Sequence, residues 1–301
     1  MKPYAALTEP KINNLLLIGA GLIGGSLTLA LKKSGVVRHI VGVGRSAAVM
    51  DEAVALGVVD VAVRVDTPEF IAAIQAADVI VLAMPVGQTR AVLDKIAPHL
   101  SPDTVITDVG STKTSVYNDA RAALGDKISQ FVLAHPIAGR EVNGPSAALA
   151  DLYINKKVMI CPHANNHSDD IELVAAMWQA TGARVFELSL TAHDEIFAAV
   201  SHLPHILAYA LMNHVADSDL SADKFAMAGA GFRDFTRIAA ASPEMWRDIC
   251  LSNSDAILKE IDAYLAHTQA LRDDIAAGNS KILLEKFAKA SDMRLEWGKE
   301  L

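Results

Sequence analysis

The chain has 301 residues, of which 51% are apolar and 21% are charged, and its formal net charge is −8. This length allows two compact domains with full cores, and this composition excludes large-scale disorder. The negative net charge disfavours nonspecific binding to nucleic acid or to an anionic membrane, because the overall field repels phosphate. We therefore expect neither kind of partner.

The two cysteines, Cys161 and Cys250, lie far apart and match no metal-binding spacing. We interpret them as buried residues of a protein in a reducing compartment, and we predict no metal site. Residues 1–10 lack an apolar core followed by a small-residue cleavage site, so the sequence predicts no signal peptide and favours a cytoplasmic location.

Short apolar runs alternate with amphipathic segments as far as residue 188. Strands that are apolar nearly throughout and separated by helices form parallel sheets covered on both faces. Residues 1–188 therefore predict a doubly wound, Rossmann-type α/β domain with a mainly parallel sheet that binds a dinucleotide. The expected strands are Leu15–Ile18, His39–Val43, Asp78–Met84, Thr104–Asp108, Gln130–Ala134, Lys157–Cys161 and Ala183–Leu188, and the helices between them include Gly25–Lys33, Ala47–Leu56, Gly87–Leu100 and Ser168–Thr181.

The first helix follows a glycine-rich turn, Gly19-Ala20-Gly21-Leu22-Ile23-Gly24. Residues 12–31 carry no charge, but these glycines interrupt the apolar run, so strand, turn and helix explain it better than a membrane span does. A G-x-G-x-x-G turn between a strand and a helix is the dinucleotide fingerprint. We assign Gly19, Gly21, Leu22, Ile23 and Gly24 to the cofactor site; the alternative is a glycine turn without a ligand.

The second predicted strand ends in Val43-Gly44-Arg45-Ser46. Enzymes that prefer NAD usually place an acid here to accept hydrogen bonds from the ribose hydroxyls, and none is present. Arg45 and Ser46 suit a 2′-phosphate, so we favour NADP over NAD, with a solvated surface arginine as the alternative. We also place Met84 and Pro85, at the end of the third predicted strand, in the cofactor site.

Beyond Leu188 the strand signal stops, and residues 189–301 predict an all-α domain. Thr191–Asp217 is expected to form one long helix that Pro204 kinks. Ser242-Pro243-Glu244 is a strong helix start, with a capping hydroxyl, a proline in the first turn and an acid near the positive end.

That helix is expected to run to about Ala277, where Gly278 stops it, and Asn279 is expected to cap a last helix ending near Trp297. Within the first of these helices an apolar stripe recurs at helical spacing, which indicates either a dimer interface or intramolecular core. The stripe consists of Ile257, Leu258, Ile261 and Leu265.

Three clusters combine polar side chains with turn residues. Asp108-Val109-Gly110-Ser111-Thr112-Lys113 follows one predicted strand, where such sheets place their ligands. His135-Pro136-Ile137-Ala138-Gly139-Arg140-Glu141 follows another. The helical half carries Ser201-His202-Leu203-Pro204-His205 and then Phe232-Arg233-Asp234-Phe235-Thr236-Arg237.

In this order, and with the Pro-x-Met-Trp motif that ends at Trp246, these motifs resemble the prephenate/arogenate dehydrogenase family of tyrosine biosynthesis, from about Asn14 to about Ile249. The resemblance implies a hydride transfer from the ring carbon bearing the hydroxyl to NAD(P), with loss of the ring carboxylate. It also implies a helical dimerisation domain, and hence a homodimer.

The resemblance assigns roles to individual residues. His135 matches the histidine that takes the hydroxyl proton, a role that suits imidazole because it titrates near neutral pH. Ser111 matches the serine that hydrogen-bonds this histidine and the substrate. Arg237 matches an arginine that binds a substrate carboxylate with its planar fork. His205 matches a substrate-contacting histidine, and Arg233 is expected to assist with the anionic side chain. Trp246 is expected in the pocket wall or in helix packing. For His202 the alternative is packing, and for Lys113 it is capping of its own loop.

Two departures from the family pattern leave the substrate preference open: Arg140 stands where some relatives carry a small hydroxyl residue, and Ala228-Gly229-Ala230-Gly231 replaces a glycine-richer stretch. Arogenate carries an ammonium group that needs a nearby carboxylate or carbonyl, for which Glu141 and Glu244 are candidates. Because Arg140 and Arg237 would neutralise them, we favour prephenate, with arogenate as the alternative. A beta-hydroxyacid-type dehydrogenase and a noncatalytic dinucleotide sensor are more distant alternatives.

Overall fold

The computed structural model describes residues 2–8, 10–140 and 142–299, and these fall into two compact units divided between Ser254 and Asp255. The predicted domain boundary between residues 188 and 189, near which strands give way to helices, lies inside the first unit.

The first unit contains a nine-stranded sheet of order β1-β9-β8-β7-β6-β5-β2-β3-β4. All neighbouring strands are parallel except β1 with β9 and β7 with β8, so the mainly parallel sheet is confirmed and two antiparallel pairs are added. The strands are β1 (Lys2–Pro3), β2 (Ile12–Ile18), β3 (Val37–Val43), β4 (Val61–Val63), β5 (Val79–Leu82), β6 (Val105–Asp108), β7 (Phe131–Ile137), β8 (Lys157–Cys161) and β9 (Arg184–Glu187).

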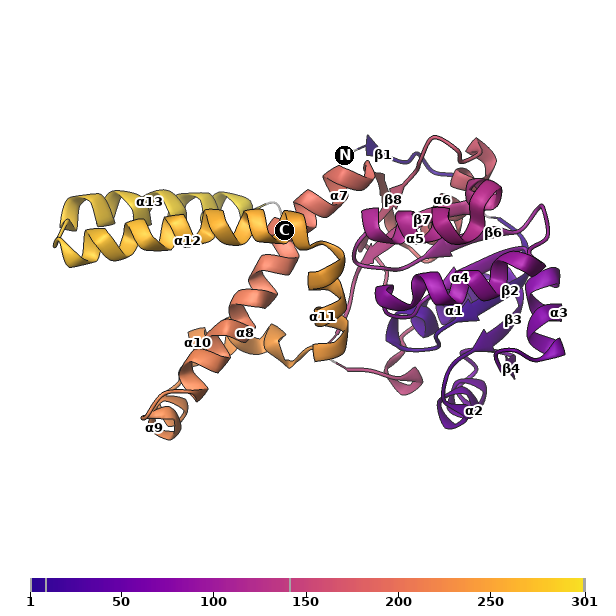
Figure 1. Cartoon of the computed structure of the whole chain (residues 1–301), viewed down its shortest axis with the longest axis horizontal. Helices are drawn as coiled ribbons and strands as arrows, with labels where there is room; N and C mark the ends of the chain where they lie inside the picture. Colours follow the sequence, from indigo (N-terminus) through magenta and orange to yellow (C-terminus); the bar gives the residue numbers. More distant parts are fainter. Residues whose placement is uncertain (1, 9, 141, 300–301) are drawn as a thin grey trace. The chain divides into compact units, whose positions relative to one another are not determined.

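Both faces of this sheet are buried, as successive residues of β2 show. Leu15 and Leu17 pack into one core cluster with α1, α2 and α6, whereas Leu16 and Ile18 pack into a second cluster with α3, α4 and α5 (Figure 1). Burying one such side chain contributes about 1.5–3 kcal/mol. These helices are α1 (Leu22–Ser34), α2 (Ala47–Ala55), α3 (Pro68–Ala76), α4 (Thr89–Ile96), α5 (Thr114–Leu124) and α6 (Ser168–Ala180).

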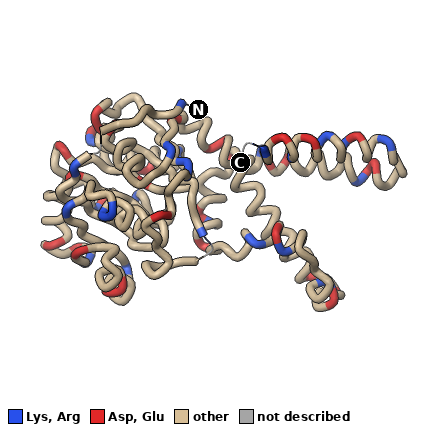
Figure 2. Tube along the Cα trace, turned by 180° about the vertical axis from the view of Figure 1, so that it is seen from behind, with Lys and Arg blue, Asp and Glu red and all other residues tan. Residues whose placement is uncertain are grey.

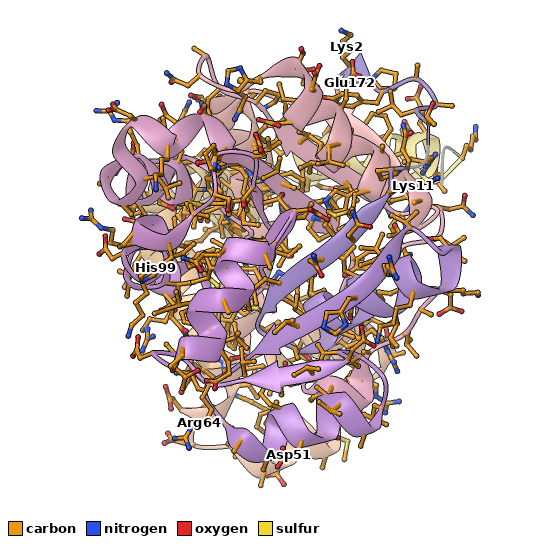
Figure 3. All side chains as sticks on the ribbon, turned by 90° about the vertical axis from the view of Figure 1, so that its right-hand side faces the viewer. Lys2, Lys11, Asp51, Arg64, His99 and Glu172 are labelled. Atoms are coloured by element: carbon orange, nitrogen blue, oxygen red, sulfur yellow. The ribbon has the colours of Figure 1, made fainter. Side chains whose placement is uncertain are left out.

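Most charged side chains lie on the outside of this unit, with Asp108, Lys113 and Asp194 among the buried exceptions. The labelled residues of Figure 3 point away from the ribbon, and five of them are exposed: Lys2, Lys11, Asp51, Arg64 and Glu172. The burial pattern therefore follows the alternation of apolar runs and polar turns that the sequence displays.

Strand β7 differs from its expected bounds. It continues past Ala134 to Ile137, because the antiparallel partner β8 extends the pairing and sets His135 opposite Met159. His135 therefore lies within a strand and not after one. The edge strands β1 and β4 were not predicted, since two or three residues are too short for a periodic signal.

The helical part of the first unit begins with α7 (Leu190–Phe197), a π-helical turn (Ala198–His202) and α8 (Leu203–Ala216). The expected extent of this long helix is confirmed. Pro204 lies in the first turn of α8, directly after the π-helical turn, where the regular α-helical bonding pattern is already interrupted. By length and composition alone these 27 residues are apolar enough to cross a membrane, a test that core helices of soluble proteins also meet.

Three further helices complete this part of the unit: α9 (Ser221–Ala226), α10 (Ala230–Thr236) and α11 (Pro243–Ser252). Ser242 caps α11 by accepting a hydrogen bond from the Met245 N–H, as predicted. The helix ends at Ser252, whereas the sequence predicted one helix to Ala277. Asn253 interrupts it because its side chain donates to the Asp194 carbonyl in α7.

The second unit consists of most of α12 (Ser254–Ala276) and of α13 (Ser280–Trp297), which lie side by side and carry charges of both signs (Figures 1 and 2). An ion pair of 2.5 Å joins Lys286 to Asp274. The bounds of α13 match the prediction, but the Asn279 side chain donates to Asp274 instead of capping α13. Apolar side chains are exposed on both helices, among them Leu258, Leu265, Leu284 and Phe287.

Candidate active site

A cleft opens where the strand order reverses. The chain runs from β2 outwards to β3 and β4 and then returns to β5 on the other side of β2, so the carboxyl ends of β2 and β5 face a crevice. The segment after β5 meets the glycine turn there, since the Ala83 N–H donates to the Ile18 carbonyl over 2.7 Å. Sheets of this kind bind nucleotides at such a point.

The three glycines of the turn differ in what a side chain at each position would meet. Gly19 has a φ of +99°, and a Cβ there would lie 2.5 Å from the Ala83 carbonyl oxygen. A Cβ at Gly24 would lie 2.4 Å from the Gly19 carbonyl oxygen, so close packing of α1 on β2 requires glycine. At Gly21 a Cβ would meet nothing within 4 Å.

Gly21 therefore leaves space in front of the N-terminus of α1, where no side chain supplies a capping hydrogen bond and no acid occupies the first turn. A helix N-terminus offers unpaired N–H groups and positive potential to an anion. The residues present thus fit the pyrophosphate of a dinucleotide.

Two cavities meet at this turn, and both are lined by Gly21, Ala83, Met84 and Pro85. The first, of about 300 Å³, extends over Gly19 and the end of β3 to Arg45 and Ser46. Its described lining includes no acidic residue, and Arg45 is exposed there. Ser46 also caps α2 by accepting a hydrogen bond from the Val49 N–H.

The second cavity, of about 350 Å³, lies on the other side of the turn. Leu22 and Ile23 form part of its wall, and Ser111, His135 and Arg140 line it as well. Thus the structure brings together a glycine turn, a hydroxyl group, an imidazole and a guanidinium group around one cavity. Further lining residues that the sequence did not single out include Val142, Asn143, Met245 and Ile249.

His135 opens to this cavity on one side and is enclosed by α7 on the other. Its Nδ1 lies 2.8 Å from Nε2 of His193, and its ring packs edge-on against Phe197 with centroids 5.0 Å apart. Burial, followed by the nearby His193, Lys113 and His202 side chains, holds the pKa of His135 well below its ordinary value. His135 is therefore neutral at pH 7.

A buried ion pair between Lys113 and Asp108 lies behind this cavity. The Lys113 ammonium group donates to the Asp108 carboxylate and, over 2.7 Å, to the Ala134 carbonyl next to His135. Asp108 also accepts from the N–H groups of Gly110 and Ala134. Lys113 thus ties the end of β6 to β7 and does not merely cap its own loop.

The predicted residues of the helical part lie behind or beside the wall of the second cavity. His205 stacks on the buried Trp246 of α11 with centroids 3.8 Å apart, and the α11 neighbours of Trp246, Met245 and Ile249, line the cavity. Trp246 therefore packs the helix. The buried His202 lies 3.2 Å from the Asn253 side-chain nitrogen, which agrees with a packing role.

Arg237 is exposed and opens a 3-10 turn, Arg237–Ala240, whose last residue lines the second cavity together with Ala241. The Tyr209 hydroxyl holds this turn by donating to the Ala241 carbonyl over 2.8 Å. Neither Arg237 nor the exposed Arg233 lines the cavity, so their contacts with a substrate stay predictions.

Of the two acids considered for an ammonium group, Glu244 is exposed and does not line the cavity, and Glu141 lies outside the described residues. Sequence reasoning missed His193 and Asp194, which are both buried in α7; the available signal was the run of three ionisable residues, His193-Asp194-Glu195.

Comparison with known proteins agrees with this arrangement. Residues 27–187 match the family model described as prephenate dehydrogenase, nucleotide-binding domain, and residues 189–289 match its dimerization domain. The chain belongs to the prephenate dehydrogenase family. The resemblance seen in the sequence motifs is thereby confirmed.

Three members of the family illustrate the match. The chain is 36% identical to a prephenate dehydrogenase of Bacillus subtilis, with 94% of this chain and 75% of that protein covered. It is 34% identical to a cyclohexadienyl dehydrogenase of Zymomonas mobilis, with 94% and 95% covered. It superposes with a TM-score of 0.88 and 34% identity on an Aquifex aeolicus prephenate dehydrogenase in complex with hydroxyphenyl propionate and NAD+, with 96% and 99% covered.

Proposed function

We propose that this protein oxidises prephenate to 4-hydroxyphenylpyruvate with release of carbon dioxide, in the biosynthesis of tyrosine. The observation that carries the proposal is that His135 and Ser111 line the same cavity as the glycine turn. A base is thereby held next to the place where a nicotinamide ring enters, as an alcohol oxidation requires.

His135 acts as the general base in this proposal. Since the hydroxyl group must lose its proton as its carbon gives up a hydride, a neutral imidazole nitrogen facing the cavity is needed, and the lowered pKa keeps His135 in that form. Ser111 orients the hydroxyl group. Loss of the ring carboxylate as carbon dioxide leaves its electron pair in the ring, which becomes aromatic, and the ring oxygen regains its proton as a phenol.

The bound cofactor supplies the hydride acceptor. The residues that line the cavity at Arg45 determine whether NAD or NADP binds. We favour NADP because Arg45 and Ser46 lie where the adenosine ribose is expected, and because the described lining of this cavity offers no carboxylate to the ribose hydroxyls. The guanidinium group suits a 2′-phosphate.

Charge in the second cavity favours prephenate over arogenate. Its described lining includes the cation Arg140 and no carboxylate, which suits the keto acid side chain of prephenate better than an ammonium group. Arg237, in the turn that forms the adjoining wall, is proposed to bind a substrate carboxylate; His205 and Arg233 are proposed as further substrate contacts.

We also propose that the protein is a cytoplasmic homodimer whose two copies are joined through the helices that follow residue 188. The match to a dimerization domain and the apolar side chains exposed on α12 and α13 support this assembly.

The test is a spectrophotometric assay of NAD(P) reduction, together with carbon dioxide release, using prephenate and arogenate against NAD and NADP. The proposal expects turnover with prephenate, and His135→Asn should lower kcat by about two to four powers of ten while cofactor binding is kept. Arg237→Gln should mainly raise the KM for prephenate.

Turnover of arogenate alone would show that arogenate, and not prephenate, is the substrate. Turnover of a beta-hydroxyacid without carbon dioxide release would show that the proposed reaction is wrong. A His135→Asn protein as fast as the wild type would reject the base, and an unaltered KM in Arg237→Gln would reject the carboxylate contact.

A further inference from the structure

A chain of hydrogen bonds leads away from His135 on the side opposite the cavity. Nδ1 of His135 lies 2.8 Å from Nε2 of His193, and Nδ1 of His193 lies 2.9 Å from the Asp194 carboxylate. His193 and Asp194 are buried in α7, whereas His135 comes from β7. The three residues therefore connect the helical part to the reacting end of the sheet.

The carboxylate at the end of this chain is fixed in place and ionised. One oxygen of Asp194 accepts from the Lys113 N–H and the other from the Thr114 N–H, each over 2.8 Å, at the N-terminus of α5. Burial by itself would raise the pKa of this carboxyl, but the hydrogen bonds from His193, Thr114 and Lys113 hold it below its ordinary value.

An ionised carboxylate can only accept hydrogen bonds, and this determines the protons along the chain. Nδ1 of His193 must carry the hydrogen that Asp194 accepts, so Nε2 of the neutral His193 ring is an acceptor. Nδ1 of His135 must then carry the hydrogen that His193 accepts. The remaining nitrogen of His135, Nε2, is left with its lone pair.

We propose that His193 and Asp194 are positioning residues that hold His135 as the Nδ1–H tautomer, with Nε2 available to take the substrate proton. This inference rests on the proposed role of His135 as the base. The same chain stabilises His135 once it is protonated, because its Nδ1–H already points to an acceptor backed by a negative charge. Without that acceptor the single proton of neutral His135 occupies either nitrogen, and the ring is free to turn.

Two substitutions at position 193 separate this role from simple packing. His193→Phe keeps an aromatic ring next to Phe197, whose centroid lies 4.6 Å away, but removes the acceptor. His193→Gln loses the ring but places an amide oxygen near the former position of Nε2. Positioning predicts that Gln retains more activity than Phe, whereas packing alone predicts the reverse.

The measurements are steady-state kinetics with prephenate and nitrogen-15 NMR of the histidine rings, with His135 assigned by comparison with His135→Asn. In the wild type we expect a protonated Nδ1 and an unprotonated Nε2 on His135. In His193→Phe we expect this pattern to be lost and kcat to fall at least tenfold, with the KM for prephenate and the Kd of the cofactor within about twofold of wild type.

His163→Phe is the matched control, because His163 is a partly buried histidine that bonds to the Phe131 carbonyl and does not line the second cavity. Its kcat and the tautomer of His135 should equal those of the wild type. Wild-type kcat in a folded His193→Phe protein, or an unprotonated Nδ1 on His135 in the wild type, overturns the inference. If His135→Asn itself retains full activity, the proposed base is wrong; if only His193→Phe does, the base stands and the positioning pair does not.

Discussion

Replacing Gly24 by alanine places a methyl group where the turn has no room. Its Cβ would lie 2.4 Å from the Gly19 carbonyl oxygen and 2.7 Å from the Ala83 Cβ. Neither atom is the far end of a flexible side chain, so the backbone must shift. Overpacking of this kind costs about 1–3 kcal/mol, and we expect the upper end of that range. For a unit of this size that lowers Tm by roughly 6–12 °C.

Gly21→Ala makes the same chemical change three residues earlier and is the matched control. The backbone at Gly21 has φ −81° and ψ −165°, which alanine adopts readily, and the added Cβ meets nothing within 4 Å. Stability should therefore stay within about 0.5 kcal/mol of wild type. Because the methyl group enters the space proposed for the pyrophosphate, the Kd of the cofactor should rise about tenfold or more.

The two variants are compared by thermal unfolding followed by circular dichroism and by calorimetric titration with NADP and NAD. A Gly24→Ala protein that melts with the wild type would show that the packing argument is wrong. A Gly21→Ala protein that binds both cofactors as tightly as the wild type would show that the phosphates do not lie in front of α1.

Three other perturbations test separate parts of the site. Arg45→Ala should weaken NADP binding and leave NAD binding unchanged, and equal effects in a titration with both would contradict a 2′-phosphate contact. Lys113→Met leaves Asp108 buried without its cation and should lower the free energy of unfolding by about 3–5 kcal/mol in urea; a loss below 1 kcal/mol refutes this. Burial lowers the folded-state pKa values of His135, His193 and His202, that of His202 to about 4 from 6.5, so the unfolded chain binds more protons as the pH falls. Stability present above pH 6.5 should therefore decrease towards pH 4, by about 1.4 kcal/mol per pH unit from His202 and further in the same direction from His135 and His193, and urea midpoints that stay constant from pH 7 to 5 would oppose this.

Much of the sheet follows from local sequence, because a strand buried on both faces must be apolar at every position. The run Leu15–Ile18 is an example, and its two faces enter two different core clusters. The end of β7 was not predicted, since the pairing of His135 with Met159 depends on a strand that comes later in the chain. The break at Asn253 was missed for the same reason: its side chain bonds to α7, 59 residues earlier.

By itself the sequence predicted the glycine turn and the family, and through the family motifs it singled out Ser111 and His135, which the structure places on one cavity. The glycine turn rests on a backbone requirement that is local, as at Gly19 with its positive φ. Only the tertiary structure decided what stands behind His135. The bonds from His135 to His193 and from Lys113 to Asp194 join residues 58 and 81 positions apart, and a hydrogen bond between distant residues leaves no periodic signal in either segment.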